Sequence, residues 1–157
     1  IPGRSVVDMT IDTMVKLSKK ENILGVKDAT NDLFRPLLTQ TIMKKNFCYL
    51  SGEDGTALAY LAQGGQGCIS VTANVAPYLC SQMHQAWREK DIEKSQYINL
   101  KLAKLHETLF IESSPGPVKF AASLIGLCNS DTRLPLVDIQ ESTKVKIKEC
   151  LNELELI

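Results

Sequence analysis

The sequence lacks a net charge and a long apolar run. Its 157 residues carry 18 Lys and Arg against 18 Asp and Glu, so no overall positive field favours nucleic acid or an anionic membrane. No apolar stretch approaches the roughly 20 residues that a membrane-spanning helix needs. We therefore expect neither a nucleic-acid partner nor a membrane partner.

The sequence also lacks paired cysteines. The five cysteines are odd in number and widely scattered, without a C-x-x-C pair or a His/Cys spacing typical of zinc: Cys48, Cys68, Cys80, Cys128 and Cys150. This pattern indicates neither a metal site nor a disulfide framework. Buried free thiols in a reducing cytosol are the preferred interpretation, which favours a cytoplasmic protein.

What is present is an ordinary globular composition, 44% hydrophobic and 23% charged, in a chain near the usual size of one domain. Three short apolar segments are predicted to be strands: residues 22–27, 47–52 and 68–73. They are continuously apolar and recur every ~20–25 residues, a pattern typical of parallel sheets built from βα units. The chain is therefore predicted to belong to the α/β class.

Helices are predicted between and after these strands. Thr10 is expected to cap the first helix, and Pro36 to begin a second that ends at Lys44 and Lys45. Asn74 is expected to cap the helix after the third strand. From about residue 91 the pattern becomes wholly helical, with helices predicted over residues 92–109, 118–127 and 141–154.

Polar residues gather where the predicted strands end, which is where parallel α/β folds carry their functional groups. The first strand ends on Lys27, the only nitrogen nucleophile among these residues. An amine held against apolar side chains loses the hydration of its charged form, and the neutral amine can attack a carbonyl to form a Schiff base. The alternative is a lysine that extends into solvent, and spacing alone favours this alternative because exposed lysines are common.

Other polar features carry weaker signals. The GGQG stretch at 64–67 precedes a strand and lacks the Walker lysine, so a phosphate cradle is not indicated. Glu53 and Asp54 have no partner motif for acid–base work and can be solvated turn residues. His84 and His106 fall on predicted helices and are interpreted as structural or solvated.

Several stretches resemble the second half of the dihydrodipicolinate synthase family. In the family's order they are IPGRSVVDMT, NILGVKDATNDL, LSGEDGTAL, GGQGCISVTANVAP, ESSPGPVKFA and RLPLV. The resemblance covers essentially the whole chain, and the motif around Lys27 and the GCISVTANVAP stretch are its most specific parts. It implies the second half of a (β/α)₈ TIM barrel, strands six to eight, within residues 1–90, and a C-terminal three-helix extension over residues 91–157.

The resemblance also implies a site and a reaction. Lys27 falls on the family's Schiff-base lysine, Arg4 on the arginine that binds the carboxylate of the aldehyde substrate, Ile69 on a residue whose backbone contacts pyruvate, and Gly52 at the rim near the substrate. The implied enzyme is a lyase that condenses pyruvate with L-aspartate 4-semialdehyde in diaminopimelate and lysine biosynthesis. It requires no metal or organic cofactor, and the full-length enzyme is expected to be a homo-oligomer.

Two departures from the family pattern accompany the resemblance. The chain begins at Ile1, so the family's proton-relay tyrosine, two residues upstream, and the first five strands are not in it. We therefore expect a fragment that is inactive without the missing half, because three strands do not close a barrel. The second departure, SSPGP at residues 113–117, lies in the helical extension and is not expected to affect the chemistry.

Alternative functions stay open at this point. N-acetylneuraminate aldolases and 2-keto-3-deoxy-sugar aldolases share the barrel and the lysine, although sialic acid aldolases generally lack an arginine at the position of Arg4. A non-catalytic remnant that acts only through its apolar surfaces is an alternative from a different class.

Overall fold

The computed structural model describes residues 1–43 and 46–157. The chain forms two compact units, Ile1–Ser70 and Val71–Ile157. The division predicted after residue 90 concerns membership of a barrel rather than packing within this chain, so it stays a prediction. Lys44 and Lys45, predicted to end the second helix, lie outside the described residues.

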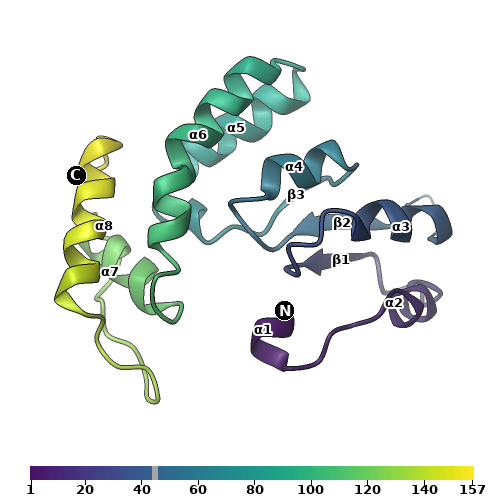
Figure 1. Cartoon of the computed structure of the whole chain (residues 1–157), viewed down its shortest axis with the longest axis horizontal. Coiled ribbons are helices and arrows are strands. Elements are labelled where there is room, and N and C mark those ends of the chain that lie inside the picture. Colours follow the sequence, from purple (N-terminus) through teal and green to yellow (C-terminus); the bar gives the residue numbers. More distant parts are fainter. Residues whose placement is uncertain (44–45) are drawn as a thin grey trace. The chain divides into compact units, whose positions relative to one another are not determined.

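The first unit is built on a parallel three-stranded sheet in the order β1-β2-β3 (Figure 1). Helices α3 and α4 connect successive strands, which is the βα alternation predicted from the sequence. The elements of this unit are α1 (Pro2–Ser5), α2 (Ile11–Ser18), β1 (Gly25–Asp28), α3 (Arg35–Ile42), β2 (Cys48–Ser51), α4 (Ala57–Ala62) and β3 (Gly67–Cys68).

The pairing of β1 with β2 depends on a glycine. Gly25 pairs with Cys48, and the register continues to Asp28 opposite Ser51. A β-carbon on Gly25 would lie 2.5 Å from the Cys48 carbonyl oxygen, so only glycine permits this approach of the strands. The paired segment begins at Gly25, three residues after the predicted start, and it extends one residue past Lys27.

The helix starts of the first unit follow the predicted signals. The Thr10 hydroxyl caps α2 by accepting a hydrogen bond from the Thr13 N–H at 3.2 Å, and Pro36 occupies the first turn of α3. Both predictions are confirmed. Phe47, Tyr49 and Tyr60, the last from α4, form a buried apolar cluster in this unit. The rings of Phe47 and Tyr49 meet edge to face with centroids 5.5 Å apart.

The third predicted strand is largely wrong. Only Gly67 and Cys68 form β3, whereas residues 68–73 were predicted to be extended. The Ile69 N–H still donates to the Ser51 carbonyl oxygen at 2.8 Å, but β2 ends at Ser51. Because the neighbouring strand offers no further residues for pairing, the β-branched run that follows turns into the short 3₁₀ helix η1 (Thr72–Asn74).

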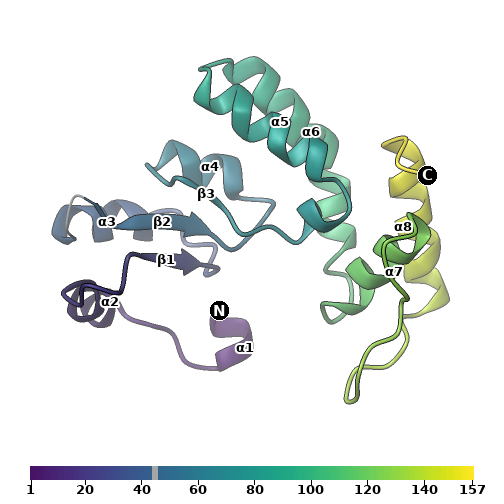
Figure 2. The same cartoon turned by 180° about the vertical axis from the view of Figure 1, so that it is seen from behind.

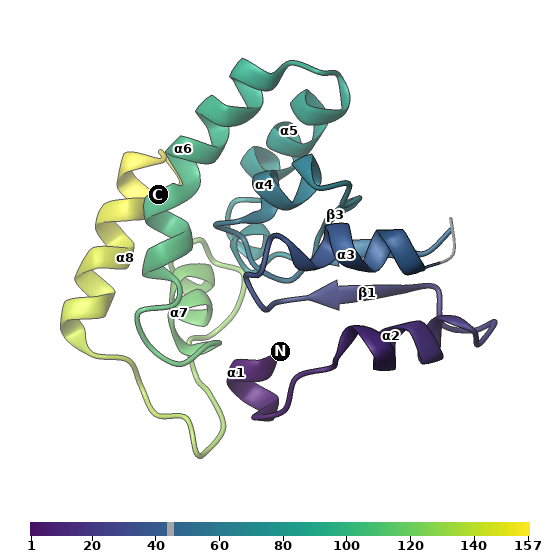
Figure 3. The same ribbon diagram turned by 45° about the vertical axis from the view of Figure 1, so that its right-hand side comes forward.

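The second unit contains η1 and four α-helices: α5 (Pro77–Arg88), α6 (Ile92–Thr108), α7 (Gly116–Leu124) and α8 (Glu141–Glu153). Helices α5 and α6 pack side by side (Figure 2), and α8 packs along α6 (Figure 3). The core between them is apolar and centred on α6, with Ile98, Leu102, Leu105, Leu109 and Ile147 among its buried members. Helices α6, α7 and α8 match the three helices predicted after residue 91.

Two boundaries in the second unit differ from the prediction. Asn74 does not cap α5; its side-chain amide donates to the Val71 carbonyl oxygen at 2.9 Å, and Ala76 is the N-cap. Helix α7 begins at Gly116, two residues early, because proline is tolerated in a first turn, where its missing N–H costs nothing.

His106 has a structural contact in the second unit, as interpreted from the sequence. Its Nδ1 lies 2.7 Å from the Thr72 hydroxyl, and both side chains are buried. Over the described part of the chain, no helix is long and apolar enough to cross a lipid bilayer.

Candidate active site

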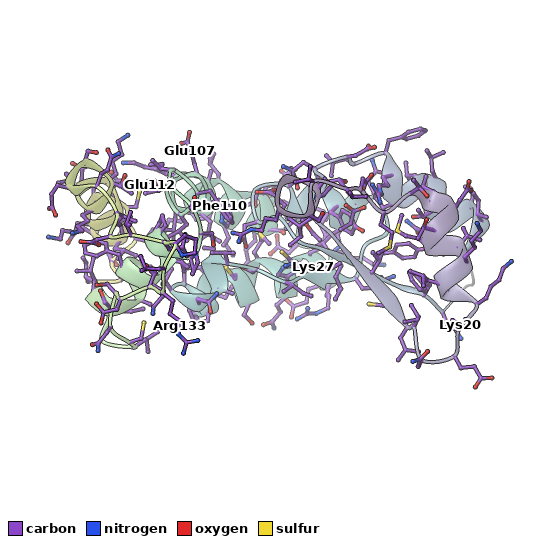
Figure 4. The ribbon with its side chains drawn as sticks, turned by 90° about the horizontal axis from the view of Figure 1, so that it is seen from below. Lys20, Lys27, Glu107, Phe110, Glu112 and Arg133 are labelled. Atoms are coloured by element: carbon purple, nitrogen blue, oxygen red, sulfur yellow. The ribbon has the colours of Figure 1, made fainter. Side chains whose placement is uncertain are left out.

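Lys27 lies at the carboxyl end of β1, the edge strand of the sheet, opposite Leu50 of β2 (labelled in Figure 4). Its side chain is exposed within the described chain. The two interpretations of Lys27 therefore both begin from an amine at a strand end, and its neighbours decide what that amine can do.

Gly52 is the first of these neighbours. It follows β2, and its N–H donates to the Asp28 carbonyl oxygen at 2.7 Å, which extends the sheet by one bond beyond the strands. The Lys27 side chain lies directly against Gly52. Its Cγ and Cε atoms are close to the place that a β-carbon on Gly52 would occupy. The structure thus brings two of the predicted site residues into contact.

Asp28, the residue after the lysine, was not predicted as part of the site. Its Oδ1 accepts hydrogen bonds from the Thr30 N–H at 3.0 Å and the Thr30 hydroxyl at 2.7 Å, and its Oδ2 lies 3.3 Å from Arg35 Nε. These contacts fold the loop after β1 into an Asx turn. The D-A-T order in the sequence is a turn signal that would have indicated the Thr30 contacts. The Arg35 contact joins separate elements, so local sequence does not indicate it.

The carboxylates after β2 have structural contacts. Glu53 accepts from both the N–H and the hydroxyl of Thr56, at 2.7 and 2.8 Å, and so stabilises the start of α4. Asp54 is buried rather than solvated, and it accepts a hydrogen bond from the Ser70 hydroxyl. Ser51 closes the loop by accepting from the Glu53 N–H at 3.1 Å. The second strand end is therefore held rigidly.

Ile69 directly follows β3, and its side chain is half exposed. Its N–H is used by the sheet, in the bond to Ser51. A backbone contact from Ile69 to a ligand would therefore come from its carbonyl oxygen. The Asp54–Ser70 bond fixes the residue immediately after it.

Arg4 lies in the one-turn helix α1 and is exposed. Figures 1 and 3 both place α1 on the side of the sheet toward which β1 points, the side where the strand ends gather. The structure thus puts the element that carries Arg4 near the rim.

Tyr49, in β2, and Tyr60, in α4, are both buried. Burial, reinforced by the negative charge of Asp28, raises the pKa of Tyr60 well above its usual range, and burial also raises the pKa of Tyr49. Both phenols stay protonated at physiological pH, so neither serves as a base. Among residues 1–43 and 46–157, no three His, Cys, Asp or Glu side chains gather in the way a metal ion requires.

The site is therefore an amine at a parallel-sheet rim, framed by a glycine, backbone carbonyls and well-anchored loops. Such an arrangement suits carbonyl chemistry through a covalent amine adduct.

Comparisons with known proteins identify the family of this chain. The profile of the dihydrodipicolinate synthetase family matches residues 1–154. The 4-hydroxy-tetrahydrodipicolinate synthase of Rhodospirillum centenum is 56% identical over 151 residues, which is 96% of this chain and 52% of the relative. The enzyme of the same name from Gluconobacter oxydans is 50% identical over 157 residues, covering 100% of this chain and 53% of the relative.

Solved structures agree with the fold. The dihydrodipicolinate synthase of Aquifex aeolicus superposes with a TM-score of 0.95 at 35% identity, over 99% of this chain and 54% of the relative. The chloride-inhibited enzyme of Acinetobacter baumannii, solved with pyruvate, gives 0.93 at 38% identity, over 100% of this chain and 54% of the relative. The fold class predicted from the sequence, part of a TIM barrel with a helical extension, is confirmed.

The chain spans about half the length of the curated relatives it matches. Within that half, the profile match is nearly complete. The chain belongs to the dihydrodipicolinate synthetase family.

Proposed function

We propose that this chain is the lysine-bearing part of a 4-hydroxy-tetrahydrodipicolinate synthase, a lyase that condenses pyruvate with L-aspartate 4-semialdehyde in diaminopimelate and lysine biosynthesis. The observation that carries the proposal is the Lys27 amine at the carboxyl end of a parallel strand, lying against Gly52. The relatives that bear this name are about half identical to the chain.

The first half of the reaction forms the nucleophile. The neutral Lys27 amine attacks the ketone carbon of pyruvate, and the resulting carbinolamine loses water to give an iminium. This cation withdraws electrons, so a methyl proton leaves and an enamine forms. Because the lysine itself provides the electron sink, the proposed reaction uses no metal and no organic cofactor.

The second half joins the two substrates. The enamine carbon attacks the aldehyde carbon of the semialdehyde, whose oxygen takes up a proton. The amine of the semialdehyde then attacks the iminium carbon and displaces Lys27, which releases the cyclic product and the free lysine. In this proposal Arg4 binds the semialdehyde carboxylate through its planar fork, the Ile69 backbone contacts pyruvate, and Gly52 lies at the rim.

Catalysis requires more strands of the barrel than the described three-stranded sheet contains. Within the described residues β1 and β3 each pair on one side only, and Lys27 is exposed. Further strands would cover these edges and the amine, which the neutral nucleophile requires. We therefore propose that the chain alone does not catalyse the condensation. We also propose that the complete enzyme is a cytoplasmic homo-oligomer.

The test is covalent capture. The chain, and a fusion of it to the part of the Rhodospirillum centenum relative that it does not match, are incubated with pyruvate and cyanoborohydride. Peptide mass spectrometry should find one reduced pyruvyl group on Lys27 of the fusion, and none at this position in a Lys27→Arg fusion. The fusion should condense pyruvate with aspartate semialdehyde, while the chain alone should not.

Three outcomes would contradict the proposal. Capture on Lys27 no faster than on the exposed Lys19 and Lys20 would indicate a non-catalytic remnant. Cleavage of N-acetylneuraminate without condensation of the semialdehyde would indicate a sugar aldolase. Full turnover by the chain alone would show that the other strands are dispensable.

A further inference from the structure

The Lys27 side chain lies against Gly52, a residue that has no side chain. A β-carbon built on Gly52 would lie 2.7 Å from Lys27 Cε and 3.2 Å from Lys27 Cγ. It would also lie 2.7 Å from the β-carbon of Ala29. Contacts below 3.0 Å essentially never occur between real β-carbons and their neighbours, so the space at Gly52 is already filled by the lysine stem and by Ala29.

Backbone conformation does not explain the glycine. Among the described glycines, Gly64 and Gly126 have positive φ angles, of 89° and 78°. Gly52 is not in that region, so an alanine would meet no backbone strain there. What excludes a side chain at Gly52 is close approach, and the atoms that approach belong to Lys27 and Ala29.

The neighbouring residues make this contact well defined. A β-carbon on Gly52 would meet the side chains of both Lys27 and Ala29, so these two side chains lie on the same side of Gly52. The hydrogen bond from the Gly52 N–H to the Asp28 carbonyl oxygen holds Gly52 opposite that segment. The Asx turn at Asp28 fixes the loop that carries Ala29.

We propose that Gly52 is a positioning residue: together with Ala29 it forms a slot that holds the aliphatic stem of Lys27 and directs its amine toward the end of β2. The catalytic consequence rests on the proposed function. In this assignment Gly52 contributes the space that its missing side chain leaves, and the shape of the slot determines where the Schiff base forms.

A lysine stem has four rotatable bonds, so an added methyl group at Gly52 should displace the amine at little cost to folding. The chemical cost is larger, because a misplacement of about 1 Å from the attack geometry reduces rates by roughly 10²-fold. The contact with Ala29 is stiffer, because its β-carbon is fixed to the backbone. Gly52→Ala therefore combines a lysine effect with a loop effect, and a second variant must separate them.

Ala29→Gly/Gly52→Ala is that second variant. It removes the methyl group of Ala29, so the new β-carbon at position 52 conflicts only with the Lys27 stem. The matched control is Gly55→Ala in the same loop, where a β-carbon would lie 3.4 Å from the Glu53 carboxylate, an ordinary contact.

The experiment measures the rate of pyruvate capture on Lys27, with cyanoborohydride, in the fusion described above. The proposal expects the rate to fall by roughly tenfold or more in Gly52→Ala and in the double variant, and to stay within about twofold in Gly55→Ala. Capture on Lys19 and Lys20 should be the same in all variants. Circular dichroism shows that each variant is folded.

The results distinguish the slot from the reaction. An unchanged rate in Gly52→Ala, or recovery of the wild-type rate in the double variant, would overturn the slot. If wild-type Lys27 reacts no faster than Lys19, the proposed function fails. The slot is then decided by the ε-methylene NMR signal of Lys27, which must shift in the double variant and must not shift in Gly55→Ala.

Discussion

Arg35 Nε lies 3.3 Å from Asp28 Oδ2, directly beside the proposed nucleophile, and both side chains are nearly buried at 10% and 6% exposure. The same guanidinium contacts Asp8 Oδ2 at 2.6 Å and donates to the Met9 carbonyl oxygen. One arginine at the start of α3 therefore ties the segment before α2 to the loop after β1. This contact holds the end of the strand that carries Lys27.

Arg35→Met should destabilise the first unit strongly. The change removes the cation while leaving the Asp28 carboxylate in its buried place, and breaking a buried pair in this way costs about 3 kcal/mol or more. Urea unfolding followed by circular dichroism measures the loss. Arg88→Met, at an exposed position at the end of α5, is the control and should change the free energy of unfolding by less than about 0.5 kcal/mol. Equal midpoints for the two variants would contradict the assigned role.

The Asp8–Arg35 pair predicts a pH dependence. The hydrogen bond from Arg35 holds the pKa of Asp8 below its usual value. A carboxyl whose folded pKa is depressed stabilises the fold above its unfolded pKa of about 3.9, and this contribution is lost as pH falls through the folded pKa. Asp8→Asn should therefore lower the melting temperature at pH 7, and this difference should disappear as pH falls through the depressed folded pKa of Asp8. Because Asp8 is 46% exposed, the difference at pH 7 should be small and should shrink with added salt. A difference independent of pH would rule out this linkage.

The sequence was sufficient to predict the order of elements and the place of Lys27. Apolar runs at βα spacing mark the strands, and a lysine at the end of such a run must lie at the rim of a parallel sheet. The capping role of Thr10 and the start of α3 at Pro36 are local signals, and both were confirmed. These features depend only on residues close together in the chain.

Features that depend on register were not predictable in the same way. The length of β3 is limited by where β2 ends, so its own β-branched residues did not indicate that it stops after Cys68. The contact between Gly52 and the Lys27 stem requires knowing which residues face each other across two strands. The burial of Asp54 likewise follows from its bond to Ser70, sixteen positions away.

The core of the second unit predicts a sharp contrast on one helix. Leu102 is fully buried in α6, whereas Leu100, two residues earlier, is 76% exposed. Leu102→Ala should cost about 2–5 kcal/mol, the range for a buried leucine that leaves a cavity, and Leu100→Ala should stay within about 0.5 kcal/mol. Because the two variants make the same chemical change in the same helix, helix propensity cancels. Similar losses measured by urea unfolding would mean that α6 presents a different face to the core.

Gly25 and Gly67 predict opposite effects for the same substitution in one sheet. A β-carbon on Gly25 would lie 2.5 Å from the Cys48 carbonyl oxygen, a backbone atom, so Gly25→Ala should separate β1 from β2 and cost about 1–3 kcal/mol or more. On Gly67 it would only touch the Leu50 side chain at 3.4 Å, and because glycine weakens a strand, Gly67→Ala should be neutral or stabilising by about 0.5 kcal/mol. Urea unfolding of both variants measures the free energies of unfolding.

Since β1 carries Lys27, Gly25→Ala in the fusion should also slow pyruvate capture, while Gly67→Ala should leave the capture rate unchanged. Equal effects of the two substitutions would show that the close approach at Gly25 does not determine the pairing of β1 with β2.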